Sequence, residues 1–370
     1  MESDLSRAEM AWRSGASGEA QRGLSAARVA LVAAFVALAL FSLGSYLFSM
    51  MLGLHMLYFT SEGQEVARQS VQLLRVYVFF YLSLPVPWPV TLGHLFAALW
   101  LIVAASMIAA ALGSPLSWTE ALRGGSAGAL QKLFGNYLLS MPVLANMLLF
   151  AVLAITGLQD IYGVPSGNIS ISDPYRGLVE LSYASVMEEL AFRIVPLGLV
   201  LLLRLLLIPA PAGSGWRRFA WAFLSPERAK SQSGLTGVRE RGPIHGLSVY
   251  EWGAILLSSA VFALAHVLSG IGWKTGKLTT TFLSGLILGL TYLYYGVPGP
   301  ILLHWYFNYY GGILEFAPQL YSGPVSLFAG LSDLVARATG GLAWLMLSLY
   351  FFLKGLRPQK WRAFKAERRN

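Results

Sequence analysis

Long apolar segments are the feature that most limits what this chain can fold into. Several of them reach the ~20 residues that an α-helix needs to cross a bilayer core of ~30 Å. Of the 370 residues, 56% are hydrophobic and only 12% are charged, whereas soluble domains carry about 25% charged residues. The alternating pattern of a transmembrane β-barrel is absent, and lipid admits only helices and closed barrels. The sequence therefore predicts an all-α fold, a polytopic transmembrane helical bundle.

About eight spans are predicted from the apolar runs, within one transmembrane domain over residues 29–356. They lie at residues 29–58, 92–113, 134–157, 177–208, 249–270, 278–296, 299–317 and 339–356. The segment 71–84, VQLLRVYVFFYLSL, is too short to cross comfortably and ends in PVPWP. We expect it to form an interfacial helix, with a tilted or broken span as the alternative.

Three polar segments lie outside these spans. Residues 1–28 are predicted to be a mobile tail, residues 357–370 a basic tail, and residues 209–248 a flexible basic loop rich in Gly, Pro, Ser and Arg. With eight spans, all three lie on one side, and that side carries 19 Lys and Arg residues against six on the other. By the positive-inside rule this side is cytoplasmic. The expected partner of the basic segments is the anionic lipid bilayer, and we expect no nucleic-acid partner.

The segment SVMEELAFRIVPLG places charged groups inside a predicted span. Each such group costs ~2.5–3.5 kcal/mol on insertion scales, so it usually faces a cavity or a partner. Glu189 and Arg193 are spaced i,i+4 and can pair along one helix face. Successive residues point ~100° apart, so Glu188 faces elsewhere and has no local cation. It must be neutral or meet water and polar groups of another helix. The alternative is an ion pair that only supports packing.

Two further spans carry polar side chains at helical spacing. In SSAVFALAHVLSG, His266 follows Phe262 at i,i+4, and in PILLHWYFNYYGG, His304 and Asn308 have the same spacing. Polar groups from three spans can converge in the interior of one bundle and satisfy one another. The remaining histidines have no charged or amide neighbours at helical spacing within a predicted span, and we interpret them as structural. They are His55, His94 and His245.

These residue types suit the hydrolysis of an amide by an activated water. A carboxylate and an imidazole can bind and deprotonate one water, and a second imidazole with a carboxamide can donate N–H groups to an oxyanion. The chain has no cysteine, which excludes a Cys nucleophile, and no HExxH zinc motif is present. A zinc site formed by Glu188, His266 and His304 stays open as the alternative. A proton-coupled transporter and a non-catalytic membrane scaffold are the competing functions.

The three motifs together resemble one known family. EExxxR, FxxxH and HxxxN, in this order and with the small-residue helix FLSGLILGLTYLYYG between the last two, resemble the CAAX-protease and bacteriocin-processing (CPBP) family of intramembrane endopeptidases. That family includes the type-II CAAX prenyl proteases. The resemblance covers about residues 177–312. It implies a protease whose substrate is a peptide or a membrane-anchored protein, possible C-terminal CAAX processing, and no required cofactor, with zinc as the alternative.

The resemblance also implies roles for individual residues. Glu188 looks like the catalytic glutamate that activates the water, with His266 as its partner. His304 and Asn308 look like the pair that stabilises the oxyanion. The remaining matches, Glu189, Arg193 and Phe262, are positions that hold the geometry of the site, and Glu189 is also a candidate for catalysis.

The predicted spans raise one conflict of depth. His266 lies near the outer end of the fifth span and His304 near the inner end of the seventh, although these spans should run parallel. The two histidines can meet only if one helix is broken, tilted or longer than predicted. We expect the irregularity near residues 270–272 or 296–299, and a second one at Pro196, just beyond the glutamate pair.

Overall fold

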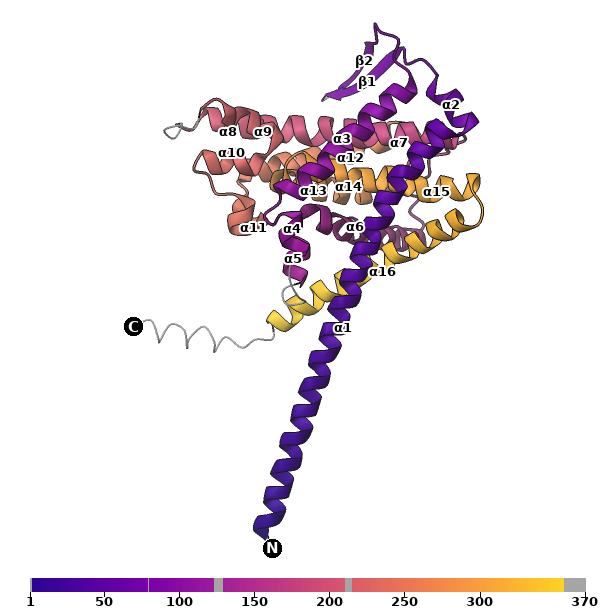
Figure 1. Cartoon of the computed structure of the whole chain (residues 1–370). Coiled ribbons are helices and arrows are strands. Elements are labelled where there is room, and N and C mark those ends of the chain that lie inside the picture. Colours follow the sequence, from indigo (N-terminus) through magenta and orange to yellow (C-terminus); the bar gives the residue numbers. More distant parts are fainter. Residues whose placement is uncertain (1, 79, 123–128, 210–214, 356–370) are drawn as a thin grey trace.

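The computed structural model describes residues 2–78, 80–122, 129–209 and 215–355. Figure 1 shows a bundle of helices with one two-stranded sheet at its edge. The elements are α1 (Glu2–Phe59), α2 (Ser61–Ala67), β1 (Leu73–Val78), β2 (Phe80–Pro85), α3 (Leu92–Gly113), α4 (Trp118–Leu122), α5 (Ala129–Gly135), α6 (Tyr137–Ile161), α7 (Pro174–Glu189), the π-helix η1 (Leu190–Ile194), α8 (Val195–Leu206), α9 (Arg217–Leu224), α10 (Pro226–Gln232), α11 (Val238–Gly246), α12 (Val249–Leu268), α13 (Lys277–Tyr295), α14 (Pro298–Trp305), the π-helix η2 (Tyr306–Tyr310), α15 (Gly311–Leu320) and α16 (Pro324–Gly355).

Six helices in the described part of the chain are long and apolar enough to cross a membrane. They are Val29–Phe59 of α1, α3, α6, α12, α13 and Pro324–Phe352 of α16. Two other predicted spans are present as helices interrupted by a π-helix, α7–η1–α8 and α14–η2–α15. The prediction of an all-α polytopic membrane bundle is thereby confirmed, while the number of eight spans stays a prediction.

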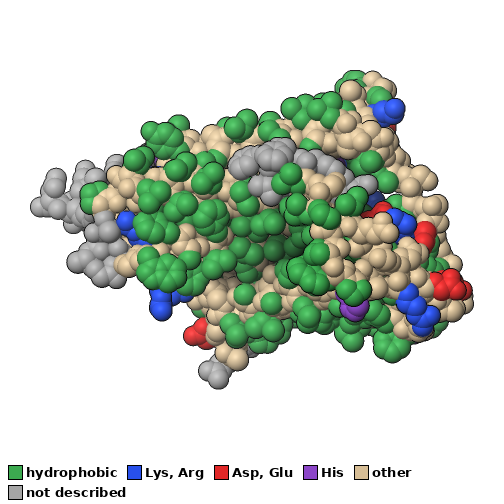
Figure 2. Space-filling view, turned by 90° about the horizontal axis from the view of Figure 1, so that it is seen from above, with side chains coloured by type: hydrophobic (Ala, Val, Ile, Leu, Met, Phe, Trp, Pro, Cys, Tyr) green, Lys and Arg blue, Asp and Glu red, His purple; other side chains and the backbone are tan. Residues whose placement is uncertain are grey.

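The bundle has two distinct ends and an apolar flank. In Figure 1 most of its helices run side by side, with α9, α10 and α11 gathered at one end and α2 and α15 at the other. Figure 2 looks onto one flank, where hydrophobic side chains are spread over much of the surface and line a central hollow. Extensive exposed apolar surface of this kind marks a site of contact with a membrane or a partner.

The segment 71–84 differs from its prediction. It forms an antiparallel hairpin, in which Leu73 pairs with Pro85 and Val78 with Phe80, and it is not an interfacial helix. The run VYVFFY is made of β-branched and aromatic residues, which prefer strands over helices. Strand β1 packs against η1 and α7, so the hairpin lies beside the part of the chain that carries the glutamate pair.

The segment 209–248 also differs from its prediction as a flexible loop, because α9, α10 and α11 fold within it. Ala222 of α9 and Ala229 of α10 are fully buried against α8. The buried Lys230 Nζ lies 2.8 Å from Glu251 Oε1 and donates to Gly246 O at 2.6 Å. These contacts fix the segment to the first turn of α12. The polar sequence of this segment does not predict these helices, because the buried residues of α9 and α10 pack against α8 and not against one another alone.

The structure describes most of the predicted N-terminal tail but not the predicted C-terminal tail. Helix α1 begins at Glu2, so the backbone of residues 2–28 is helical, and their mobility stays a prediction. The basic tail 357–370 lies outside the described residues.

Candidate active site

The glutamate pair ends α7, and the chain then widens into the π-helix η1. Pro196 has no N–H, so the Phe192 carbonyl four residues earlier loses its helical donor. The Ser258 hydroxyl of α12 donates to this carbonyl instead. Val195 N–H donates to Leu190 O, five residues earlier, which is the hydrogen bond of a π turn. Such single π turns are frequent at functional sites. The helix irregularity that was predicted at Pro196 is therefore this π turn, and it begins directly after Glu188 and Glu189.

Glu189 is the fully buried, ion-paired member of the pair, and its contacts are made through one oxygen, Oε1. Its side chain has 0% exposed surface and Arg193 has 1%. Glu189 Oε1 accepts from Arg193 Nη1 at 3.1 Å and lies 2.6 Å from His304 Nδ1. The carboxylate therefore joins η1 to α14, and it is the ion-paired group expected from the i,i+4 spacing.

Arg193 is held by an aromatic ring as well as by Glu189. Its guanidinium carbon lies 3.9 Å from the centroid of the Phe262 ring, a cation–π contact. The Phe262 ring also lies 4.5 Å from His266 and 6.2 Å from His304, measured between centroids. Phe262 thus sits at the centre of the cluster and contacts residues from all three motifs.

Glu188 has a different environment from its neighbour. Its side chain is 21% exposed, and its Oε2 lies 3.7 Å from His304 Nε2. Among the described residues, this buried oxygen has no hydrogen-bond partner. Glu189 Oε2 also lacks a partner, so the accessible surface of Glu188 is what distinguishes it from its fully buried neighbour.

The proton position on His266 follows from its backbone contact. His266 Nδ1 lies 2.9 Å from Phe262 O, and because a carbonyl only accepts, Nδ1 must carry the proton. In the neutral ring Nε2 then holds the lone pair and can accept a hydrogen bond from water. The Phe262 ring contacts both this ring and that of His304, and His304 Nε2 lies 3.7 Å from Glu188 Oε2, so the two acceptors belong to the same cluster.

His304 and Asn308 share a face of α14 and η2, as predicted. Asn308 Nδ2 lies 3.2 Å from His304 Nε2. With Nδ1 donating to the Glu189 carboxylate, the neutral His304 ring accepts from the Asn308 amide. One N–H of that amide remains for another acceptor. A chain of contacts thus runs from Arg193 through Glu189 and His304 to Asn308.

His266 and His304 both lie beside the Phe262 ring, despite the conflict of depth between their spans. Helix α14 starts where Val297 N–H donates to Leu224 O of α9 at 3.1 Å, so it begins against the folded 217–246 segment. Gly296 has φ 78°, and a Cβ there would lie 2.5 Å from the same carbonyl. The close approach that fixes the start of α14 therefore requires glycine. The expected irregularity at 296–299 lies here.

A network of buried polar groups around η2 was missed by the sequence analysis. Tyr306 Oη donates to Asn146 Oδ1 at 2.6 Å, and Asn146 Nδ2 donates to Ser42 Oγ at 3.1 Å. Tyr309 Oη donates to the carbonyls of Ser49 and Met50. These bonds tie η2 to α1 and α6 and thereby fix the helix that carries His304 and Asn308. The signal was the run YFNYY, whose tyrosines need buried partners.

The residues proposed as an alternative zinc site do not have the arrangement of one. Zinc needs three ligands whose lone pairs point at the ion. The Nε2 lone pair of His304 is directed at the Asn308 amide, and the described residues hold no group of three His, Cys, Asp or Glu side chains placed to bind a metal.

The three other histidines have structural surroundings. His55 Nδ1 lies 2.8 Å from Tyr321 Oη, and the His94 ring accepts from Thr91 N–H in the capping box of α3. His245 lies exposed on α11.

The apolar helices and the buried cluster define an integral membrane protein with a polar site inside its bundle. Residues 170–310 match the family model described as "Type II CAAX prenyl endopeptidase Rce1-like". The match bears out the resemblance that the motifs suggested, over this part of the chain. The comparisons found no matching curated protein and no matching solved structure.

Proposed function

We propose that the protein cleaves a peptide bond with a water activated by Glu188 and His266, without a covalent intermediate or a metal. The observation that carries this proposal is the contrast within the glutamate pair. Glu189 is fully buried and bonded to Arg193 and His304. Glu188 is 21% exposed and pairs with no arginine or lysine among the described residues. An oxygen of each carboxylate lacks a hydrogen-bond partner, but only that of Glu188 belongs to a side chain that a water can reach. A free carboxylate beside an imidazole with a free lone pair is the arrangement needed for general-base catalysis.

The reaction follows from these positions. The water donates one hydrogen bond to Glu188 and one to His266 Nε2, and its oxygen attacks the peptide carbonyl as Glu188 takes the proton. The resulting oxyanion accepts from the remaining N–H of Asn308, and also from His304 Nε2 when that nitrogen is protonated. Glu188 then gives its proton to the leaving amine as the C–N bond breaks. Atoms and charges balance, and the carboxylate is regenerated.

The buried Glu189–Arg193 ion pair supports this chemistry because it positions the residues that bind the oxyanion. Arg193 and Glu189 hold His304 through its Nδ1, and His304 in turn holds Asn308. The alternatives of a transporter or a scaffold gain no support from this arrangement, since the polar groups converge on one another and do not line up as a path.

For the substrate, we propose a C-terminal CAAX segment of a prenylated protein, in line with the family. The charge asymmetry supports a topology with both termini in the cytoplasm. A membrane-anchored substrate of this kind can reach the site from the bilayer, which restricts its search to two dimensions.

We expect the purified protein in lipid nanodiscs to release the intact C-terminal tripeptide from a farnesylated CAAX peptide, as identified by mass spectrometry of both products. The control is the same peptide with its C-terminus amidated and its farnesyl group removed, which should be cleaved more slowly. Release of single residues from the C-terminus would contradict an endopeptidase, and absence of any product would contradict the proposed substrate.

A further inference from the structure

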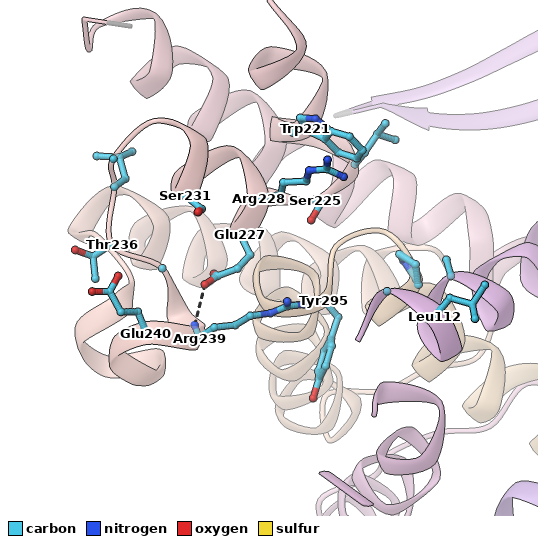
Figure 3. A pocket seen from close by; sticks show the side chains of 17 residues that line it. Leu112, Trp221, Ser225, Glu227, Arg228, Ser231, Thr236, Arg239, Glu240 and Tyr295 are labelled. Carbon is cyan, nitrogen blue, oxygen red and sulfur yellow. Dashed lines mark hydrogen bonds between the residues drawn. The ribbon is translucent and has the colours of Figure 1, made fainter. Parts of the chain in front are cut away.

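A cleft of about 1140 Å³ lies at the end of the bundle formed by α9, α10 and α11, away from the candidate active site. Figure 3 shows side chains from several elements around it. The end of α3 contributes Leu112, the folded segment contributes Trp221, Arg228 and Arg239, and the end of α13 contributes Tyr295. Because α3 is a candidate membrane span, the cleft opens at the level where a membrane helix ends.

Two arginines of this cleft have no anionic partner of their own. Among the described residues, neither Arg228 nor Arg239 forms an ion pair, and both lie exposed. The Arg228 guanidinium carbon lies 4.1 Å from the Trp221 ring centroid, and that of Arg239 lies 5.4 Å from the Tyr294 ring centroid. Contact with an aromatic face holds a guanidinium in place while leaving its N–H fork open to a ligand.

Two acidic residues, Glu227 and Glu240, also line the cleft (Figure 3), and among the described residues neither forms an ion pair with the two arginines. Both carboxylate oxygens of Glu227 accept backbone N–H groups at the start of α11, from Val238 and Arg239, each at 2.9 Å. Figure 3 draws the second of these bonds. Glu227 therefore shapes the cleft, and it does not neutralise the arginine side chains.

We propose that this cleft binds the phosphate headgroup of an anionic membrane lipid. The arginine forks match a phosphate in charge and geometry. Leu112, whose side chain is 69% exposed on α3, offers an apolar surface to the acyl chains, and Trp221 is a residue type that prefers the membrane interface. Basic pockets beside membrane helices on the cytoplasmic side are typical sites for such headgroups, and the charge asymmetry assigns this end of the bundle to that side. A soluble phosphate could bind the two arginines, but it has no acyl chain to contact Leu112 of α3.

The test is a titration of the purified full-length protein in detergent, followed by native mass spectrometry, with phosphatidylglycerol and phosphatidylcholine as the two probes. We expect the wild-type protein to bind phosphatidylglycerol more tightly than phosphatidylcholine. The double variant Arg228→Ala/Arg239→Ala should lose this preference, with a Kd for phosphatidylglycerol raised about tenfold or more. The control Arg241→Ala removes an exposed arginine of α11 that does not line the cleft, and it should bind like wild type.

Two further measurements separate a lipid from a soluble anion. Leu112→Ser should weaken binding of phosphatidylglycerol, and glycerol 3-phosphate should bind far more weakly than the lipid. Equal binding of both lipids by wild type would overturn the proposal without recourse to any variant. Equal affinity for glycerol 3-phosphate and phosphatidylglycerol would overturn the assignment to a lipid, and so would a double variant that binds like Arg241→Ala.

Discussion

Replacing Glu188 by Gln is expected to lower the peptidase rate by ~10²–10⁴-fold, the contribution typical of a general base. Gln has nearly the same shape and can still hold a water, but its amide cannot take the water's proton. The Glu188 Oε2 atom has no hydrogen-bond partner among the described residues, so the substitution breaks no hydrogen bond of this atom. We therefore expect thermal unfolding to stay unchanged while kcat falls. The rate is measured on the farnesylated peptide at saturating substrate.

The matched control for this variant is Glu180→Gln. Glu180 lies on the same helix, but its side chain is 64% exposed and pairs with Arg176 at the surface. It should retain the full rate. A Glu188→Gln variant that is as active as Glu180→Gln would reject Glu188 as the base.

Replacing Arg193 by Met is expected to cost about 3–5 kcal/mol in the free energy of unfolding, because it leaves the Glu189 carboxylate buried without its cation. The side chains of both partners are almost fully buried, and the arginine also contacts the Phe262 ring. The free energy can be measured by titration with a denaturing detergent in mixed micelles. The control Arg176→Met breaks an exposed pair of the same spacing on α7, and such pairs contribute about 0–1 kcal/mol.

A double variant separates the charge effect from the packing effect. Glu189→Gln/Arg193→Met removes both charges, so much of the lost stability should return. Activity should stay low, because His304 then lacks the carboxylate that orients it. If Arg193→Met were no less stable than Arg176→Met, the ion pair would not support the site as described here.

The sequence was informative where a feature depends on spacing along one helix. The i,i+4 pairs Glu189–Arg193, Phe262–His266 and His304–Asn308 all exist as helix-face neighbours, and the apolar runs predicted the membrane helices. The irregularities at Pro196 and residues 296–299 were also foreseen, because proline and glycine carry their backbone preferences with them.

Features that depend on contacts between distant segments were not predictable in this way. The bond from Ser258 to Phe192 completes a π turn on another helix, and the bond from Tyr306 to Asn146 joins helices far apart in the chain. Glu251 looked like an ordinary residue at the start of a helix, yet it pairs with Lys230 and Arg204. Hydrophobic periodicity contains no information on such partners, since each residue alone has an ordinary structural role.

Metal dependence tests most directly whether protein side chains alone activate the water. The measurement is peptidase activity on the farnesylated peptide after exhaustive treatment of the purified protein with 1,10-phenanthroline, together with its zinc content. With Glu188 as the base and with His304 bonded to Glu189 and Asn308, we predict that activity is retained and that zinc is substoichiometric. Loss of activity on chelation that is restored by adding zinc would contradict this account and assign Glu188, His266 and His304 as metal ligands.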